Sequence, residues 1–376
     1  MIYLDNAATT LVKPKSVERA VLCAMQTCAN PGRGGHPAAM RAAKVVYSCR
    51  ETVAELFGLD DPTRVIFTQN ATHALNIAIQ SIMRNGGHAV VSGYEHNSVI
   101  RPLTALEDSG VSFTIANAPL FSPAAQVLAM EQAIRPDTVC IICNHVSNVF
   151  GYVQNLAAIN ALCRKKGLKL ILDLSQSAGA IPISASELSE ANFLCMPGHK
   201  GLYGPQGTGI LICCKGDCHY SIIQGGTGSD SQNFRQPTDL PEGLESGTLN
   251  VPGIAGLQEG VRFVLRETPA AIGAWEKELK EYFLQKARNI PGLTVFGAPC
   301  CQSGVVSIIS SRCLPEILGE RLGEMGICLR AGLHCAPAAH QSAGTLPQGT
   351  LRISFSAFNK KSEVDTLCFK ILKTNS

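Results

Sequence analysis

Long apolar runs are missing from this sequence of 376 residues. None approaches the roughly 20 residues that a membrane-spanning helix needs, and the opening MIYLDNAATT lacks the basic and then apolar segments of a secretory signal. We therefore expect a cytoplasmic protein that does not bind a membrane. A dominant charge is missing too, since 32 basic residues face 29 acidic ones and the longest basic run is Arg164 to Lys166. This balance argues against nucleic acid as a partner.

A metal-binding pattern of cysteines is missing as well, although the chain has 16 of them. The single CxxC, Cys140 to Cys143, lies inside the apolar run TVCIICNHVS, which is typical of a buried strand, and Cys213 and Cys214 are adjacent. A zinc site would need a second pair at comparable spacing. We therefore predict no metal site, and reduced thiols that mostly pack as small core residues.

What the sequence does have is enough apolar residue, 45% of the chain, for a substantial core and more than one minimal domain. Short β-rich runs alternate with segments whose apolar residues recur at helical spacing. The strand candidates are RVIFT, HAVVSG, SFTIA, TVCIICNH, LKLILDLS, NFLCMPG and TGILICC. They predict an α/β fold whose large domain has a mainly parallel seven-stranded sheet flanked by helices. Ligand sites of such sheets gather at the carboxyl ends of the strands.

Beyond Gly260 the pattern changes, and a smaller C-terminal α/β domain is predicted. One long amphipathic helix is expected over residues 260–289, followed by the short strands LTVFGA and GVVSIIS and the tail from Thr350. The segment at 225–250 is rich in Gly, Ser, Pro and Asp and has little periodicity. It is too long for an idle connection, so it is either disordered or functional.

The glycine-rich stretch GHKGLYGPQGTG raises the question of a nucleotide loop. A Walker A motif requires Ser or Thr after its lysine, and here Gly201 follows Lys200. Asp173, at the end of the apolar run LKLILD, offers a different partner for this lysine, although an ordinary helix cap at Asp173 stays an alternative. An aspartate that keeps a pyridinium protonated and a lysine that forms a Schiff base are the pair that pyridoxal 5′-phosphate needs.

Two further stretches could complete such a site. RVIFTQNATHALNIAIQ passes from a strand through a polar turn into a helix, which places Ala71 and Thr72 where free N–H groups favour an anion. A simple helix cap at Asn70 or Thr72 explains this stretch equally well. His96 comes just past another strand and could lie on a cofactor ring, or it could be a solvated loop histidine.

Eight motifs occur in a family-specific order: LDNAATT, EHNS, SNVFG, DLSQSAG, GHKGLYGPQGTG, ESGTLN, RAGLHCAP and LRISFSAFN. In this order they resemble the cysteine desulfurase and selenocysteine lyase family, of the class V aminotransferase type, over nearly the whole chain. The resemblance implies the pyridoxal-phosphate transferase fold type I. It also implies a large cofactor-binding domain over residues 14–258, and a small domain that combines residues 1–13 with residues 259–376 and carries a catalytic cysteine loop.

The resemblance assigns roles to the cofactor residues. Lys200 would hold pyridoxal 5′-phosphate covalently and move protons, and His96 would stack on its ring as a catalytic residue. Asp173 would pair with the ring nitrogen, and Gln176 would approach the ring oxygen. The other implied contacts reach the phosphate, and they come from Ala71, Thr72, His199 and, from the neighbouring subunit, Thr248. A homodimer with shared active sites follows from the last of these contacts.

The same resemblance assigns the substrate and the sulfur chemistry. Asn148, Arg330 and Arg352 would hold L-cysteine or L-selenocysteine, with an arginine gripping the carboxylate. Cys335 lies in RAGLHCAP, whose Gly and Pro indicate a loop, where a reactive thiolate is expected. Its attack on the substrate sulfur would leave a persulfide on Cys335 and release alanine. The short loop resembles the branch that passes its persulfide to a dedicated acceptor protein, as in iron–sulfur cluster assembly.

Alternatives and one departure stay open. The protein could instead be a selenocysteine lyase, another pyridoxal-phosphate aminotransferase or lyase, or a cofactor-free relative that only binds ligands. The family usually has a serine three residues before the lysine, and Pro197 stands there in this chain. Because proline carries no donor, one phosphate contact must come from elsewhere.

Overall fold

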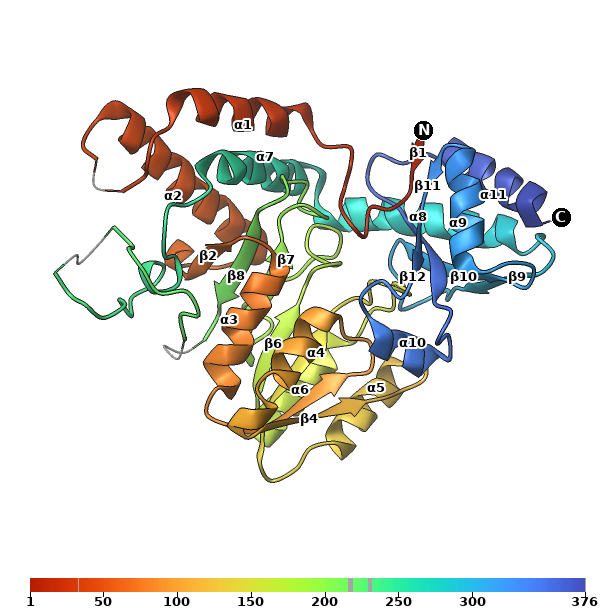
Figure 1. Cartoon of the computed structure of the whole chain (residues 1–376), viewed down its shortest axis with the longest axis horizontal. Coiled ribbons are helices and arrows are strands. Elements are labelled where there is room, and N and C mark those ends of the chain that lie inside the picture. Colours follow the sequence, from red (N-terminus) through yellow and green to blue (C-terminus); the bar gives the residue numbers. More distant parts are fainter. Residues whose placement is uncertain (33, 216–218, 229–231, 376) are drawn as a thin grey trace.

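The computed structural model describes residues 1–375 apart from 33, 216–218 and 229–231, and it contains two main sheets (Figure 1). One sheet has seven strands and the other has four. The N-terminal strand β1 (Ile2–Tyr3) does not join either of them, because it pairs in parallel with β11 (Ile327–Cys328). The start of the chain therefore lies against its C-terminal part.

The seven-stranded sheet forms from the seven predicted runs. Its strands are β2 (Val65–Thr68), β3 (Gly87–Ser92), β4 (Val111–Ala116), β5 (Thr138–Asn144), β6 (Lys169–Asp173), β7 (Ala191–Pro197) and β8 (Gly209–Cys213). Their order is β2-β8-β7-β6-β5-β3-β4, and only β8 runs antiparallel to its neighbours. The predicted mainly parallel seven-stranded sheet is thus confirmed.

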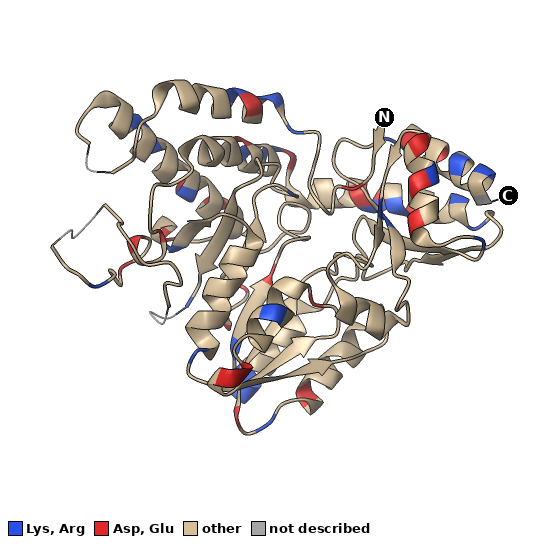
Figure 2. Ribbon diagram, in the orientation of Figure 1, with Lys and Arg blue, Asp and Glu red and all other residues tan. Residues whose placement is uncertain are grey.

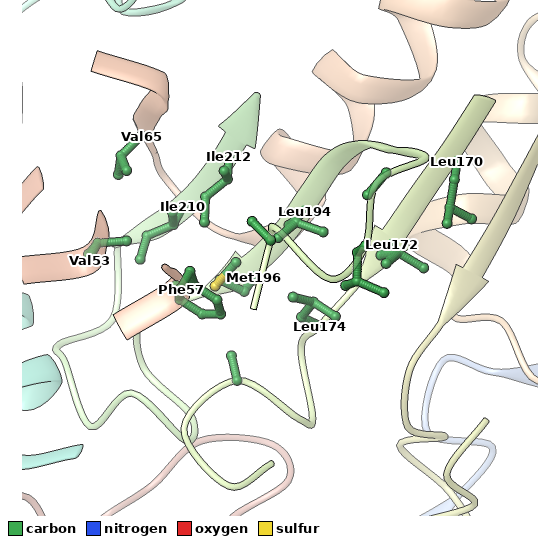
Figure 3. Packing of buried hydrophobic residues seen from close by; sticks show 14 of the residues in the cluster. Val53, Phe57, Val65, Leu170, Leu172, Leu174, Leu194, Met196, Ile210 and Ile212 are labelled. Atoms are coloured by element: carbon green, nitrogen blue, oxygen red, sulfur yellow. The ribbon is translucent and has the colours of Figure 1, made fainter. Parts of the chain in front are cut away.

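Helices cover both faces of this sheet because its strands are apolar on both sides. The helices of the large sheet are α1 (Lys15–Thr27), α2 (Pro37–Phe57), α3 (Ala71–Met83), α4 (Asn97–Thr104), α5 (Pro123–Gln132), α6 (Leu156–Lys166) and α7 (Val251–Glu267). Helices α3 and α4 pack on one face, and α2, α5, α6 and α7 pack on the other. Figure 3 shows side chains of the second face, where Val53 and Phe57 of α2 meet Met196 and Ile210.

The CxxC pair shows this two-sided burial directly. Cys140 packs in the cluster under α3 and α4, whereas Cys143 packs in the cluster under α2 and α6. Residues three apart in a strand point to opposite faces, so these two thiols cannot hold one metal ion. Among the described residues, no cluster of His, Cys, Asp and Glu could ligate a metal, and no described helix is long and apolar enough to cross a membrane.

The four-stranded sheet belongs to the C-terminal part and is antiparallel throughout. Its strands are β9 (Leu293–Phe296), β10 (Val305–Ser310), β12 (Arg330–Gly332) and β13 (Thr350–Ser354), in the order β12-β13-β10-β9. Its helices are α8 (Pro269–Ala287), α9 (Pro315–Glu324), α10 (Pro337–Ala343) and α11 (Lys361–Asn375). Figure 2 shows both signs of charge interspersed on α8, α9 and α11, which fits solvated outer faces.

The single helix predicted over residues 260–289 is wrong. Helix α7 ends at Glu267 and α8 begins at Pro269, with Thr268 between them at a φ of 66°. Proline disfavours a helical conformation in the residue before it and cannot donate a helical hydrogen bond, so the chain turns there. Because α7 runs through residue 258, the predicted boundary after that residue falls inside a helix, and the division into domains stays a prediction. In the segment at 225–250, of which 229–231 lie outside the described residues, one 3₁₀ turn forms at Glu242–Leu244.

Candidate active site

One pocket lies at the carboxyl ends of the central strands β5, β6 and β7. Asn144, the last residue of β5, is in register with Asp173, the last residue of β6, and Asp173 is in register with Cys195 of β7. Parallel pairing therefore brings polar residues from far apart in the chain to one edge. The pocket is lined by Asn70, Ala71, Thr72, Leu75, His96, Ser98, Asn144, Val146, Asn148, Asp173, Ser175, Gln176, Pro197, His199 and Lys200.

Lys200 and Asp173 form the charged part of this pocket. Asp173 is 5% exposed, and one of its oxygens accepts a hydrogen bond of 2.8 Å from the backbone N–H of Ser175. Burial lowers the pKa of Lys200 to about 8, against the opposing effect of Asp173 and with a smaller lowering by Arg352 and Arg330. The lysine is therefore closer to its neutral, nucleophilic form than an exposed lysine would be.

The start of α3 forms one end of the pocket. Asn70 caps this helix, and its side-chain oxygen accepts from the N–H of His73 at 2.9 Å. The first helical residues, Ala71 and Thr72, line the pocket next to this cap. Both explanations of this stretch therefore hold at once, because a capped helix start also presents N–H groups to an anion.

His96 also lines the pocket, at the cap of α4. Its Nδ1 accepts from the backbone N–H of Ser98 at 3.0 Å, so the neutral ring carries its proton on Nε2. Burial lowers the pKa of His96 to about 4. The ring is thus uncharged near neutral pH, as a ring that stacks on a cofactor should be.

Cys335 lies outside this pocket, in the short connection from β12 to α10. Its thiol is exposed, and His334 and Cys335 both adopt left-handed backbone conformations with φ of 50° and 57°. Two hydrogen bonds tie this connection to the pocket. The N–H of Asn97 donates to the carbonyl of Cys335 at 2.8 Å, and the side chain of Asn148 donates to the carbonyl of His334 at 2.8 Å.

Arg352 is buried beside the pocket and already has partners. Its Nη2 donates to Asp5 at 2.7 Å and its Nη1 to the carbonyl of Asn148 at 3.0 Å, while its buried Nε has no partner among the residues that the structure describes. Arg330 is the register partner of Arg352 across β12 and β13. Asp5 offsets one of these two like charges, so the group keeps a net positive charge and an anion beside the arginines is favourable.

Thr248 lies apart from the pocket that holds Lys200. It is exposed and lines a different cavity of about 730 Å³. The turn before it is anchored by Glu245, which pairs with the buried Arg50 and accepts from the N–H of Phe67 at 2.6 Å. Thr248 is therefore exposed at the end of a turn that is fixed to the rest of the chain.

The predicted residues thus divide into those the structure brings together and those it does not. The pocket gathers Ala71, Thr72, His96, Asn148, Asp173, Gln176, His199 and Lys200. Arg330 and Arg352 flank it on the four-stranded sheet, Cys335 follows β12, and Thr248 is elsewhere in the same chain. Sequence reasoning missed Ser98, Asn144 and Asp5. Position in EHNS and LDNAATT was the only signal for Ser98 and Asp5, and Asn144 ends a predicted strand.

The fold and the pocket together define an α/β protein of the type that holds pyridoxal phosphate at a strand end. The sequence model of the aminotransferase class-V family matches residues 2–367. A probable cysteine desulfurase of Methanothermobacter thermautotrophicus is 30% identical over 376 residues, covering 97% of this chain and 92% of its own. The chain belongs to the aminotransferase class-V family.

Solved structures agree with this assignment. The apo structure of a cysteine desulfurase from Thermococcus onnurineus NA1 is similar with a TM-score of 0.91 at 26% identity, covering 99% of this chain and 94% of that one. The S-sulfonic acid form of the cysteine desulfurase CsdA from Escherichia coli reaches a TM-score of 0.86 at 26% identity, with the same coverage.

The pocket fits pyridoxal 5′-phosphate, the cofactor of this family. Within the described residues, neither the amine of Lys200 nor the second carboxylate oxygen of Asp173 forms a hydrogen bond, so both are available to a ligand. Within the described residues the ring of His199 has one hydrogen-bond partner, the hydroxyl of Thr9 at 3.0 Å from Nδ1, so its Nε2 is available to a ligand. An amine, a carboxylate and a capped helix start are the groups that the aldehyde, the ring nitrogen and the phosphate require.

Proposed function

We propose that this chain is a pyridoxal-phosphate-dependent cysteine desulfurase, which converts L-cysteine to L-alanine and keeps the sulfur as a persulfide on Cys335. One observation carries this proposal. An exposed thiol lies in a short loop whose backbone is hydrogen-bonded to Asn97 and Asn148, beside the pocket that contains Lys200 and Asp173. These hydrogen bonds would hold the nucleophile in a fixed relation to the cofactor pocket.

Named residues would hold the cofactor. Lys200 would bond to its aldehyde, Asp173 to its ring nitrogen and Gln176 to its ring oxygen, with His96 against the ring. The phosphate would lie at the start of α3, near Ala71, Thr72 and His199. When bound, the cofactor withdraws electrons from the α-carbon of an attached amino acid, which makes its α-proton acidic.

The two arginines would receive the substrate carboxylate. The buried Nε of Arg352 has no partner in the described ranges of the chain, and Arg330 is its exposed neighbour in the sheet. A carboxylate beside them relieves their repulsion and supplies the missing acceptor. Asn148, whose buried Oδ1 has no partner in the described part of the chain, would accept a substrate N–H.

Lys200 would move the proton. Its free amine would take the α-proton of the substrate and return it later in the cycle. The lowering of its pKa to about 8 suits this task, because a general base works best with a pKa near the working pH.

Cys335 would take the sulfur. Its thiolate attacks the substrate sulfur, an S–S bond forms, and the C–S bond breaks with its electron pair left on carbon. The proton lost by the thiol ends on that carbon, so the products are alanine and the persulfide. Exposure of Cys335 then lets an acceptor protein with its own thiol reach the sulfur.

A homodimer with shared sites is part of the proposal. Thr248 is exposed on a turn that Arg50 and Glu245 anchor, beside a cavity of about 730 Å³. In a dimer, Thr248 of one subunit would reach the cofactor phosphate of the other subunit. Apolar side chains are also exposed on the nearby α1 and α2, where Met25 is 67% and Tyr47 52% exposed. Hiding them stabilises a dimer.

Hybrid dimers test the shared site. One subunit carries Lys200→Ala together with Thr248→Ala, and the other is wild type, so the only lysine-bearing site lacks a partner threonine. We expect it to release the cofactor faster than in the control hybrid, whose Thr248→Ala lies on the lysine-bearing subunit. Equal release from both hybrids would reject the contribution of the partner.

The cytoplasm is the proposed location, since every described cysteine is free and a reducing compartment keeps such thiols available.

The proposed activity is tested by measuring alanine from L-cysteine and L-selenocysteine side by side. We expect Cys335→Ala to lose turnover on L-cysteine and to keep the visible absorbance of the lysine-bound cofactor. Full turnover by this variant would contradict the proposal. A strong preference for L-selenocysteine that survives the substitution would favour a selenocysteine lyase.

A further inference from the structure

The end of β7 contributes no hydroxyl to the phosphate end of the pocket. Pro197 lines the pocket three residues before Lys200, and it can supply neither a hydroxyl nor an N–H. A phosphate dianion is stably bound only where enough donors face it. The question is which other side chain makes up for this loss.

Among the described residues that line the pocket, the hydroxyls are those of Thr72, Ser98 and Ser175. Ser175 belongs to the ring end, because its N–H donates to Asp173 and its neighbour is Gln176. Ser98 lies at the other end. It is only 8% exposed, and its Oγ lies 2.7 Å from the Oγ1 of Thr72.

The hydrogen bonds of Ser98 connect two parts of the site. Its Oγ also lies 2.9 Å from Nδ1 of His96, which already accepts from the backbone N–H of Ser98 at 3.0 Å. Helices α3 and α4 therefore begin side by side, and a hydroxyl from each start meets the other. This pair of hydroxyls lies beside the helix start that would bind the phosphate.

We propose that the hydroxyl of Ser98 is part of the phosphate site and replaces the one that Pro197 cannot supply, an inference that rests on the proposed cofactor. Without an anion, one hydroxyl of the pair donates to the other, and Nδ1 of His96 already accepts from the backbone N–H of Ser98. A phosphate offers an acceptor to each hydroxyl, so both protons turn to it, and Ser98 then supplies a donor in addition to that of Thr72.

Apoenzyme carrying Ser98→Ala tests this proposal. Dissociation constants are measured for pyridoxal 5′-phosphate and for pyridoxal, which has the same ring and aldehyde but no phosphate. We expect roughly tenfold weaker binding of the phosphorylated form, the usual loss for a hydrogen bond to a charged group, and unchanged binding of pyridoxal. Equal weakening of both ligands, or of neither, would overturn the proposal.

Three further variants separate this effect from a general disturbance. Ser98→Thr keeps the hydroxyl and should bind like wild type. Ser98→Ala combined with Pro197→Ser restores the hydroxyl from the other side, so it should recover phosphate-dependent affinity. Ser342→Ala removes a serine that bonds to the carbonyl of Gly93 away from the pocket, and it should change neither constant.

Failure of this inference differs from failure of the proposed function. If wild-type protein binds neither pyridoxal 5′-phosphate nor pyridoxal, the cofactor assignment itself is wrong. If wild type and Ser98→Ala bind the phosphorylated form equally well, the cofactor assignment stands and Ser98 has no part in the phosphate site. Thermal unfolding of each apo variant checks that all of them are folded.

Discussion

The pocket around Lys200 and the loop around Cys335 are built in opposite ways. Lys200 and Asp173 lie at the ends of apolar strands in a mainly parallel sheet, where burial shifts the pKa of the lysine. Cys335 lies in the connection that follows β12, the edge strand of a small antiparallel sheet, and it is exposed and in a left-handed backbone conformation.

The difference follows from the two tasks. An amine that moves protons needs a buried place that brings its pKa toward neutrality, whereas a thiol that passes sulfur to another protein must be reached from outside. The two sheets separate these needs. Only two hydrogen bonds, from Asn97 and Asn148, tie the backbone at His334 and Cys335 to the pocket in the part of the chain that the structure describes.

The largest expected effect is the loss of turnover when Lys200 in the buried pocket is replaced. Lys200→Ala removes both the bond to the cofactor and the proton carrier, and general acid–base groups contribute about 10² to 10⁴-fold to a rate. We expect alanine formation to fall by at least this factor and the visible absorbance of the lysine-bound cofactor to disappear. Turnover within tenfold of wild type would contradict the role of Lys200, and the exposed Lys165, replaced in the same way, serves as control.

The next largest effect is the slowing of cofactor uptake at low pH, which again depends on the buried Lys200. Because the pKa of Lys200 is lowered to about 8, its neutral fraction falls about tenfold for each pH unit below that value. Cofactor uptake by apoenzyme should therefore slow by roughly 50 to 100-fold from about pH 8 to about pH 6. A stopped-flow absorbance series measures this, and a rate independent of pH would show that the amine is not perturbed.

The amine of Lys200 also predicts in which direction the free energy of unfolding changes with pH. Between about pH 8 and its ordinary value of 10.5, Lys200 is protonated in the unfolded chain and neutral in the folded one. Folded protein then binds fewer protons, so the free energy of unfolding of apoenzyme should rise with pH over this window. Urea titrations of wild type and Lys200→Met check it, since the variant should lack this part of the rise.

A smaller effect is expected where the two regions are joined. Asn148→Ala removes the hydrogen bond to the carbonyl of His334, a contact typically worth about 1 kcal/mol. We predict up to about tenfold lower kcat/KM for L-cysteine, with cofactor affinity changed far less. Loss of the cofactor in this variant would contradict the assignment of Asn148 to the substrate and the loop.

The smallest effect concerns the support under the pocket. Glu95 is fully buried next to His96, and burial raises its pKa to about 8. Its stabilising contribution is complete below the unfolded value of 4.5 and declines as pH rises toward 8. Glu95→Gln mimics the protonated acid, so its free energy of unfolding should lie within about 1 kcal/mol of wild type near pH 5 and depend less on pH. A variant as pH-dependent as wild type would refute the shift.

The buried region was far more predictable from the sequence than its connections. Each of the seven apolar runs became a strand, because a strand covered on both faces must be apolar throughout, and Asp173 and Lys200 follow such runs. The break at Thr268 was missed, although Pro269 signals it locally. Ser98 beside Thr72 and Asp5 beside Arg352 depend on how helices and distant termini pack, which no local pattern encodes.

The most direct test of the account is to find where the sulfur goes. Protein with bound cofactor is mixed with L-cysteine, its thiols are alkylated, and the protein is digested. The mass of each cysteine-containing peptide is then measured by mass spectrometry. One extra sulfur atom should appear on the peptide with Cys335 and not on the peptide with Cys300 and Cys301, whose Cys300 thiol is also exposed. The extra sulfur should be absent in Lys200→Ala. Sulfur on another cysteine, or undiminished alanine formation by Cys335→Ala, would contradict the assignment of Cys335 as the sulfur carrier.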